Sequence, residues 1–295
     1  MKYQEFENQL QKEIRDAFNS EIQMNIRWIE KINRGKEKAI LLGRRDQDAK
    51  ATFYLNQLYQ QYQEGESLQE IVRDMIKACR ENDWNCRQLL EHLSSWEFVR
   101  SYIYPRLIPY EQNREMLERI PHQRWLDLAV VLYYEEPELF QKQGTILLSN
   151  AHIENWPVAE EELFAIAVKN AQRDLPPCLE DIWGVINQSV GEWDEETVGE
   201  SAPIYVLTNS QKVYGASCLL YPNLLEEIGE RFNSDLYVLP SSQHECIILP
   251  MSKTEFKPEE LKIMVREVNE TMVSPQELLS YEVYRYLREE KQLVA

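Results

Sequence analysis

Long apolar runs are missing from this sequence of 295 residues. No stretch approaches the roughly 20 apolar residues that a bilayer-spanning helix needs. The opening residues MKYQEFENQLQKEIRDAF mix charged and apolar side chains throughout, so they lack the apolar region of a secretory signal. We therefore expect a cytoplasmic protein that makes no contact with a membrane.

Glycine is scarce, with nine residues in the whole chain. Close approach of the backbone to a phosphate usually needs glycine, and the patterns G-x-x-x-x-G-K-[ST] and G-x-G-x-x-G are both absent. The nucleophile-elbow pattern G-x-S-x-G and the zinc-helix pattern H-E-x-x-H are missing too. These absences disfavour the common nucleotide-binding and hydrolase classes, and we expect no cofactor.

Cysteine and histidine occur without metal-binding or disulfide spacing. The cysteines form an odd, widely spread set without a C-x-x-C pair, which is typical of free thiols in a reducing compartment. No two histidines are three or four residues apart, the spacing that places two imidazoles on one helical face. The sequence therefore predicts no metal site. The residues concerned are Cys79, Cys86, Cys178, Cys218, Cys246, His92, His122, His152 and His244.

Positive charge is also in short supply, because the net charge is −18. Affinity for nucleic acids depends largely on Lys and Arg that displace counterions, so direct binding of nucleic acid is not expected. The acidity is concentrated in residues 143–211, where Lys169 and Arg173 face 12 acidic residues, a net of 2 − 12 = −10.

The residues that are present favour a folded α+β protein, since 43% of them are hydrophobic and 11% aromatic. Residues 3–18 carry an apolar side chain every three or four positions, which predicts an amphipathic helix. Residues 24–29 and 39–42 read as two strands joined by a turn. Ser67 and Glu70 form a capping-box pattern that begins another helix. The N-terminal region is therefore predicted to mix helices with a basic hairpin.

The C-terminal region predicts the element order strand, helix, strand, strand, helix, strand. The expected ranges are 204–208, 219–232, 236–239, 245–249, 258–269 and 281–286. This βαββαβ-like order is that of a split βαβ unit. The polar, acidic stretch GEWDEETVGES at residues 191–201 is the best linker candidate. We therefore expect an N-terminal α+β region over 1–200, with an acidic segment at 143–200, and a C-terminal α+β domain over 201–295.

The densest polar cluster is the predicted turn Pro240-Ser241-Ser242-Gln243-His244-Glu245 between two apolar strands. One interpretation makes His244 a base toward Ser241 or Ser242, with Glu245 orienting the imidazole. The other is an ordinary hairpin turn, since adjacent residues of an extended chain point to opposite faces and rarely converge. These four residues are the candidate catalytic groups.

Candidate binding residues lie in two further places. His152 and Trp156, four apart on a predicted helix that also contains Asn150, either form a binding cluster or pack on each other. Asn209 follows a predicted strand, where an asparagine commonly bonds to its own backbone.

Two charged segments suggest contacts with other proteins. The basic turn with Arg34, Lys36 and Lys38 is suited either to docking on an acidic partner or to solubility alone. The run Asp194-Glu195-Glu196 either imitates a phosphate surface or is a solvated linker.

The sequence resembles a family of bacterial proteins, domain-of-unknown-function family 5688. The resemblance is carried by residues 202–250, which include the tract LYVLPSSQHE at 236–245, by LKIMVREVNETMVSPQELLS at 261–280, and by Thr52-Phe53-Tyr54-Leu55-Asn56. Asn150, His152, Trp156 and Asn209 also lie at positions of the family pattern. The resemblance covers nearly the whole chain. It implies a bacterial cytosolic protein of unassigned activity and supplies no catalytic residues.

Three functional hypotheses follow. The first is a non-enzymatic protein-interaction or regulatory module that uses the acidic middle of the chain and the exposed edge of a C-terminal sheet. The missing catalytic motifs and the large charge of one sign favour it. The second is a hydrolase-like enzyme with a site around His244, which requires a serine hydroxyl within hydrogen-bond reach of the imidazole. The third is an acidic decoy of a nucleic-acid-binding protein, which requires the carboxylates of residues 180–200 on one face.

Overall fold

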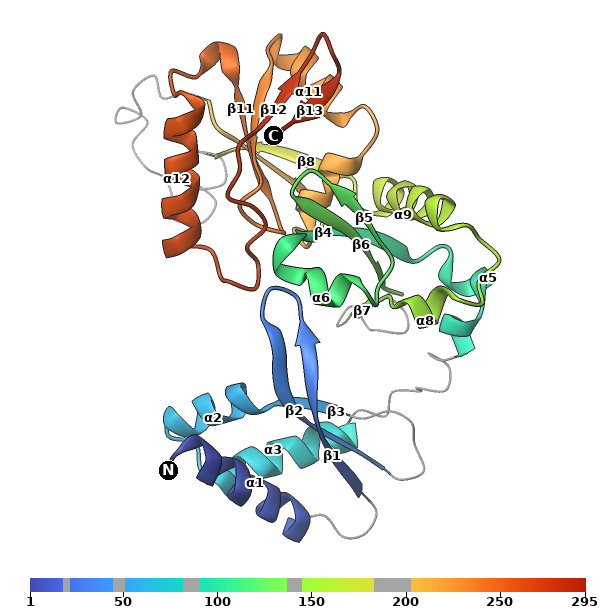
Figure 1. Ribbon diagram of the computed structural model, residues 1–295, viewed down its shortest axis with the longest axis vertical. Helices are drawn as coiled ribbons and strands as arrows, with labels where there is room; N and C mark the ends of the chain where they lie inside the picture. The colour runs from blue at the N-terminus through green and yellow to red at the C-terminus, as the bar shows by residue number, and fades with distance from the viewer. Residues whose placement is uncertain (18–21, 45–50, 82–90, 137–144, 183–202) are drawn as a thin grey trace. The chain divides into compact units, whose positions relative to one another are not determined.

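The computed structural model describes residues 1–17, 22–44, 51–81, 91–136, 145–182 and 203–295. The chain divides into two compact units, Met1–Ser94 and Ser95–Ala295. Both units combine helices with sheets, so the predicted α+β class is confirmed (Figure 1). No helix in the described ranges is long and apolar enough to cross a membrane.

The described part of the first unit contains a three-stranded antiparallel sheet and the helices α1, α2 and α3, and residues 91–94 are also helical. Its elements are α1 (Tyr3–Ala17), β1 (Ile22–Lys31), β2 (Gly35–Arg44), β3 (Ala51–Tyr54), α2 (Leu55–Gln63) and α3 (Leu68–Glu81). The strand order is β1-β2-β3. One core joins the helices to the sheet, and its fully buried members include Phe6, Leu10, Ile14, Ile40, Leu42 and Leu55.

The two helices predicted most directly from local pattern are confirmed. The apolar stripe of α1 is buried in the core, as its three- and four-residue spacing requires. At the start of α3, the backbone N–H of Ser67 donates to the Glu70 carboxylate at 2.9 Å, and the N–H of Glu70 donates to the Ser67 hydroxyl at 3.3 Å. This reciprocal pair is the predicted capping box.

The hairpin of β1 and β2 is also confirmed, and its register runs from Ile22↔Arg44 to Lys31↔Gly35. Its turn places Asn33 and Gly35 at φ values of 63°. Asparagine and glycine tolerate this left-handed conformation best, which explains why the chain reverses here. Figure 1 shows the hairpin projecting beyond α1, α2 and α3.

A buried ion pair connects α1 to this hairpin. The Glu7 side chain is 4% exposed and its carboxylate bonds to the Lys38 ammonium of β2. The amide of Gln11 also donates to Glu7 at 3.2 Å. Because a buried carboxylate is costly unless it is paired and hydrogen-bonded, these two partners are what make Glu7 tolerable inside the unit.

The second unit begins with a four-stranded antiparallel sheet of order β4-β6-β5, with β7 paired to β6. The elements of this part are α5 (Trp96–Val99), β4 (Ile103–Pro109), η1 (Glu111–Asn113), α6 (Arg114–Leu117), β5 (His122–Trp125), β6 (Leu128–Tyr134), β7 (Ile146–Leu147), α8 (Asn150–Ile153) and α9 (Glu160–Asp174). Helix α9 is tied to the start of β4, because the Asn170 amide donates to the carbonyls of Arg100 at 2.8 Å and Ile103 at 3.1 Å.

The second unit also contains a six-stranded sheet of order β13-β12-β10-β11-β9-β8. Its elements are β8 (Pro177–Asp181), β9 (Tyr205–Asn209), η3 (Gly215–Leu220), α11 (Leu224–Phe232), β10 (Leu236–Leu239), β11 (Cys246–Pro250), η4 (Met251–Lys253), α12 (Pro258–Thr271), β12 (Tyr284–Leu287) and β13 (Gln292–Val294). Helix α12 packs on one face through Leu261 and Val265. Helix α11 lies on the other face, where Phe232 contacts Tyr205 with ring centroids 4.5 Å apart.

The split βαβ prediction is confirmed by this sheet. Strands β9 and β10 are both antiparallel to β11, which lies between them, so they are parallel to each other and α11 is their crossover. In the same way, β11 and β12 are parallel, are separated by β10, and are connected by α12.

One of the contacts that link the two sheets of the second unit is made by a carboxylate. Asp127, in the turn before β6, accepts hydrogen bonds from the hydroxyls of Ser280 at 2.7 Å and of Tyr284. Tyr284 is fully buried, so its hydroxyl depends on this partner.

Several elements differ from the sequence expectation. Strand β8, which the sequence analysis did not predict, begins at Pro177 and pairs with β9. The six-stranded sheet therefore contains strands from both sides of residue 200. The boundary predicted there falls in 183–202, outside the described residues, and stays a prediction. The helix expected from 219 begins at Leu224, because residues 215–220 form the 3₁₀ helix η3.

Candidate functional site

The turn at residues 240–245 lies between β10 and β11 and is largely buried. Ser242 and Gln243 are 5% and 2% exposed. The hydroxyl of Ser242 accepts a hydrogen bond from the backbone N–H of His244 at 3.0 Å, and the carbonyl of Ser241 accepts one from Leu279 at 3.0 Å. The Ser242 hydroxyl therefore bonds to backbone, which is an ordinary role of serine in a turn.

The His244 imidazole contacts Tyr214 and Glu277, and not the serines or Glu245 that the sequence suggested. Its Nδ1 accepts a hydrogen bond from the backbone N–H of Tyr214 at 3.3 Å, and its ring stacks on the Tyr214 ring with centroids 5.7 Å apart. Its Nε2 lies 3.7 Å from the carboxylate of Glu277, whereas no contact with Glu245 is found among the described residues. No described serine hydroxyl contacts the ring either, so the geometry that the hydrolase hypothesis requires is not formed.

Arg106, in the middle of β4, completes this cluster. Its Nε donates to the side-chain oxygen of Gln243 at 2.7 Å, and its guanidinium lies 4.0 Å above the Tyr214 ring. Burial lowers the pKa of Arg106 from its ordinary value. The residue therefore connects β4 to the 240–245 turn, a contact across 137 positions that no sequence pattern signalled.

The Asn209 side chain bonds to the backbone of its own loop, which is the structural role that the sequence suggested. Its amide donates to the carbonyl of Val213 at 2.8 Å, and its side-chain oxygen accepts from the backbone N–H of Gln211 at 3.0 Å. These bonds shape the loop between β9 and η3. The loop in turn positions Tyr214, which is held at φ 53° and contacts both Arg106 and His244.

Asn150, His152 and Trp156 are not brought together into one site. His152 accepts a hydrogen bond from the backbone N–H of Ser149 at 3.0 Å and so caps the start of α8, while burial lowers its pKa. Asn150 bonds to the carbonyl of Glu118 at 3.4 Å. Trp156 is 5% exposed and packs on Trp96 with centroids 5.6 Å apart. The described contacts of all three residues are those of caps and core.

A hollow of 530 Å³ lies in the same unit, where the end of α9 meets the start of β4. Its lining residues are Ser101, Tyr102, Tyr104, Glu135, Arg173, Asp174, Leu175 and Gln211. Sequence reasoning missed this site. Tyr102, Tyr104 and Glu135 come from or beside paired strands, whereas Arg173 and Asp174 come from a helix. Only the fold brings them together.

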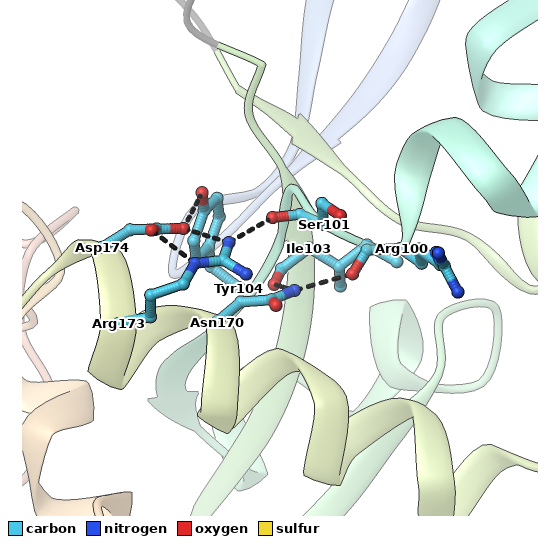
Figure 2. Close-up of polar contacts among 7 residues, drawn as sticks. All are labelled: Arg100, Ser101, Ile103, Tyr104, Asn170, Arg173 and Asp174. Carbon is cyan, nitrogen blue, oxygen red and sulfur yellow. Dashed lines mark hydrogen bonds and ion pairs between the residues drawn. The ribbon is translucent and has the colours of Figure 1, made fainter.

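Figure 2 shows the polar contacts that several of these lining residues form with one another. The Tyr104 hydroxyl donates to Asp174 at 3.0 Å, and the Arg173 Nε donates to the same carboxylate at 2.6 Å. Arg173 also donates to the carbonyl of Ser101 at 2.9 Å. The Arg173 guanidinium holds the pKa of Asp174 below its usual range, while burial and this carboxylate raise the pKa of Tyr104.

Glu135 differs from Asp174 because burial alone raises the pKa of its carboxyl group. A raised pKa in the folded state means that ionised Glu135 lowers the free energy of unfolding. This cost is fully present above the folded-state pKa, and it vanishes as the pH falls below the pKa of glutamate in the unfolded chain.

We therefore expect Glu135→Gln to raise the melting temperature of the second unit at neutral pH, by on the order of a degree. The gain should shrink as the pH falls toward and below the ordinary glutamate pKa of about 4.3, because the Glu135 carboxyl is then increasingly protonated in both the folded and the unfolded chain. Scanning calorimetry of the two proteins across this pH range measures the difference. A gain that grows toward acid pH would contradict the assignment.

Comparison with known proteins identifies a class but no activity. The chain belongs to a family of unknown function, DUF5688, which matches residues 3–288. The resemblance found in the sequence is thereby confirmed over nearly the full length. No curated protein and no solved structure matches the chain.

Proposed function

We propose that this protein is a non-enzymatic protein-interaction module that contacts its partner through the β1–β2 hairpin. The observation that carries this proposal is Trp28, whose side chain is 65% exposed on β1. Tryptophan is the most enriched residue at the energetic centre of protein interfaces, because it buries a large apolar area while its N–H finds a hydrogen-bond partner.

The position of Trp28 follows from the hairpin geometry. Successive side chains of a strand alternate between faces, so Trp28 shares a face with Met24 and Ile26, which pack on the core of the unit. The apolar face of the hairpin thus continues outward to Trp28, a position where the core no longer covers it.

The charge beside Trp28 indicates an acidic partner. Residues 27–38 contain Arg27, Lys31, Arg34, Lys36 and Lys38 against Glu30 and Glu37. Four of these five cations are paired. Arg34 lies 3.1 Å and Lys31 3.3 Å from Glu37, Lys36 lies 3.9 Å from Glu30, and Lys38 bonds to Glu7 of α1. The segment still keeps a positive excess within a chain of net charge −18, and such an excess favours an acidic protein surface.

The contacts of the 240–245 turn support a non-enzymatic role, because the Ser242 hydroxyl and the His244 imidazole bond to backbone instead of to each other. The decoy hypothesis concerns the carboxylates of residues 180–200, most of which lie outside the described ranges, and it stays a prediction.

Site-specific photocrosslinking in the native host tests the proposal. A benzophenone amino acid at position 28 should give one discrete adduct with an acidic protein, and Lys36→Glu should reduce that adduct strongly. The control places the same group at Phe98, which is 54% exposed in the second unit. Once the partner is known, Trp28→Ala should weaken binding by about tenfold or more, with an unchanged melting temperature because Trp28 lies outside the core.

Failure to form a discrete adduct at position 28 would rule out the hairpin as the contact surface. Adducts of the same mass and yield from position 98 would mean that the capture is unspecific.

A further inference from the structure

The hollow beside Tyr104 contains one carboxylate that no described residue neutralises. Asp174 is compensated, because it bonds to both Arg173 and Tyr104. Glu135 is bonded through its backbone N–H to the carbonyl of Tyr102 at 3.0 Å. Its side chain forms no ion pair or hydrogen bond with another described residue, and burial raises its pKa. A partly buried carboxylate without a counterion is costly to a fold that does not use it.

Aromatic rings stand beside this carboxylate. Tyr102 and Tyr104 are two residues apart around the start of β4, so they project to one side, and both line the hollow together with Glu135. Tyr104 is 5% exposed and is fixed by its hydrogen bond to Asp174. Tyrosine rings attract cations through their negative faces, and a carboxylate among such rings is the usual arrangement for a bound organic cation.

The other polar groups of the hollow do not favour an anion or a metal ion. Among the lining residues that the structure describes, the only cation is Arg173, whose guanidinium is already bonded to Asp174 and to the carbonyl of Ser101. The described residues contain no group of three or more metal-ligating side chains. A metal ion at Glu135 would therefore lack ligands, since oxygen-binding cations require several.

We propose that this hollow binds an organic cation, an alkylammonium or guanidinium group, with Glu135 as its counterion and the rings of Tyr102 and Tyr104 as its walls. Its volume of 530 Å³ lies within the range of small-ligand sites. The inference is independent of the proposed function, because that proposal rests on the hairpin of the first unit.

The charge of the second unit favours such a ligand. Residues 95–295 hold 17 Lys and Arg against 34 Asp and Glu, so their net charge is 17 − 34 = −17. A protein surface with a net charge of one sign raises the local concentration of ligands that carry the opposite charge. The same guanidinium or ammonium chemistry occurs in free polyamines and in the side chains of basic peptides, and the two sources are separated by experiment.

Titration calorimetry of the full chain with three probes tests the proposal: agmatine, spermidine and a capped Gly-Arg-Gly peptide. At least one probe should bind in the micromolar to millimolar range. Glu135→Gln should lower the affinity for that probe by about tenfold or more, because the substitution removes the charge-assisted contact. Tyr102→Leu should weaken it several-fold. Stronger binding of agmatine or spermidine identifies a free amine as the ligand, whereas stronger binding of the peptide identifies a basic side chain.

Glu267→Gln is the matched control, since it removes the same charge from an exposed position on α12. It should leave the affinity unchanged, which separates a local site from general attraction to an acidic protein. The melting temperature of Glu135→Gln shows independently that the variant is folded. Absence of binding by all three probes, or an equal loss of affinity in Glu267→Gln and Glu135→Gln, would overturn the proposal.

Discussion

Gly215→Ala is expected to destabilise the second unit by about 3 kcal/mol or more, the upper range for overpacking a core. A Cβ atom at this position would lie 2.2 Å from the Thr208 hydroxyl, 2.4 Å from the carbonyl oxygen of His244 and 2.7 Å from the backbone nitrogen of Asn209. Two of these three atoms belong to backbone, so no side-chain rotation relieves the contact.

The clash would also break a structural hydrogen bond. The Thr208 hydroxyl donates to the carbonyl of His244 at 2.7 Å, and the added methyl group would meet both atoms. The loop that carries Tyr214 would then have to move away from β9, and Arg106 would lose its aromatic neighbour. Calorimetry should show a melting temperature about 10 °C lower for this unit.

Gly229→Ala is the matched control. Its Cβ would meet the flexible Arg288 side chain at 3.0 and 3.4 Å and a carbonyl oxygen at 3.4 Å, and the residue lies inside α11. Alanine favours a helix over glycine by about 1 kcal/mol, so this variant should be neutral or slightly stabilising. If the two variants melted at the same temperature, the tight packing of Gly215 would be disproved.

Lys38→Met should destabilise the first unit by about 3 kcal/mol. The substitution removes the cation that pairs with Glu7, whose side chain is 4% exposed, and leaves the amide of Gln11 as its described hydrogen-bond donor. An uncompensated buried charge costs more than the intact pair contributes. Hydrogen exchange read by mass spectrometry should show faster exchange in α1 and β2, and no change in the second unit.

The double variant Glu7→Leu with Lys38→Met separates this cause from simple loss of packing. Removing both charges should restore most of the stability, because an apolar pair of similar volume has no desolvation penalty. Lys36→Met provides the comparison, since its ion pair with Glu30 is long, at 3.9 Å, and 46% exposed on the lysine side. A loss under about 1 kcal/mol is expected there. A double variant as unstable as Lys38→Met would contradict the explanation.

Local structure was predictable wherever neighbours in sequence determine it. The stripe of α1, the Ser67–Glu70 capping box and the β1–β2 turn depend on contacts within a few residues. The βαββαβ order followed from the same kind of signal. The sheet order did not, because a strand pattern records which face is buried and not which strand lies alongside.

The candidate site was less predictable, since its contacts span long distances in the chain. Tyr104 and Asp174 are 70 positions apart, and Arg106 and Gln243 are 137 apart. The local sequence identified the polar turn around His244, but in the structure its side chains bond to backbone and stack on Tyr214. It could not identify Glu135, whose distinguishing property is the absence of a described counterion in the folded chain. A single carboxylate carries no sequence signal of that kind.

The placement of Pro177 has a consequence for solubility. It lies in β8, the last strand at one margin of the six-stranded sheet, and a proline has no N–H with which to pair a further strand. The opposite margin is β13, which is three residues long. Short or proline-containing marginal strands are the devices by which natural sheets avoid aggregation. The edge strands β8 and β13 of the larger sheet are therefore poorly suited to pair with a strand of another chain.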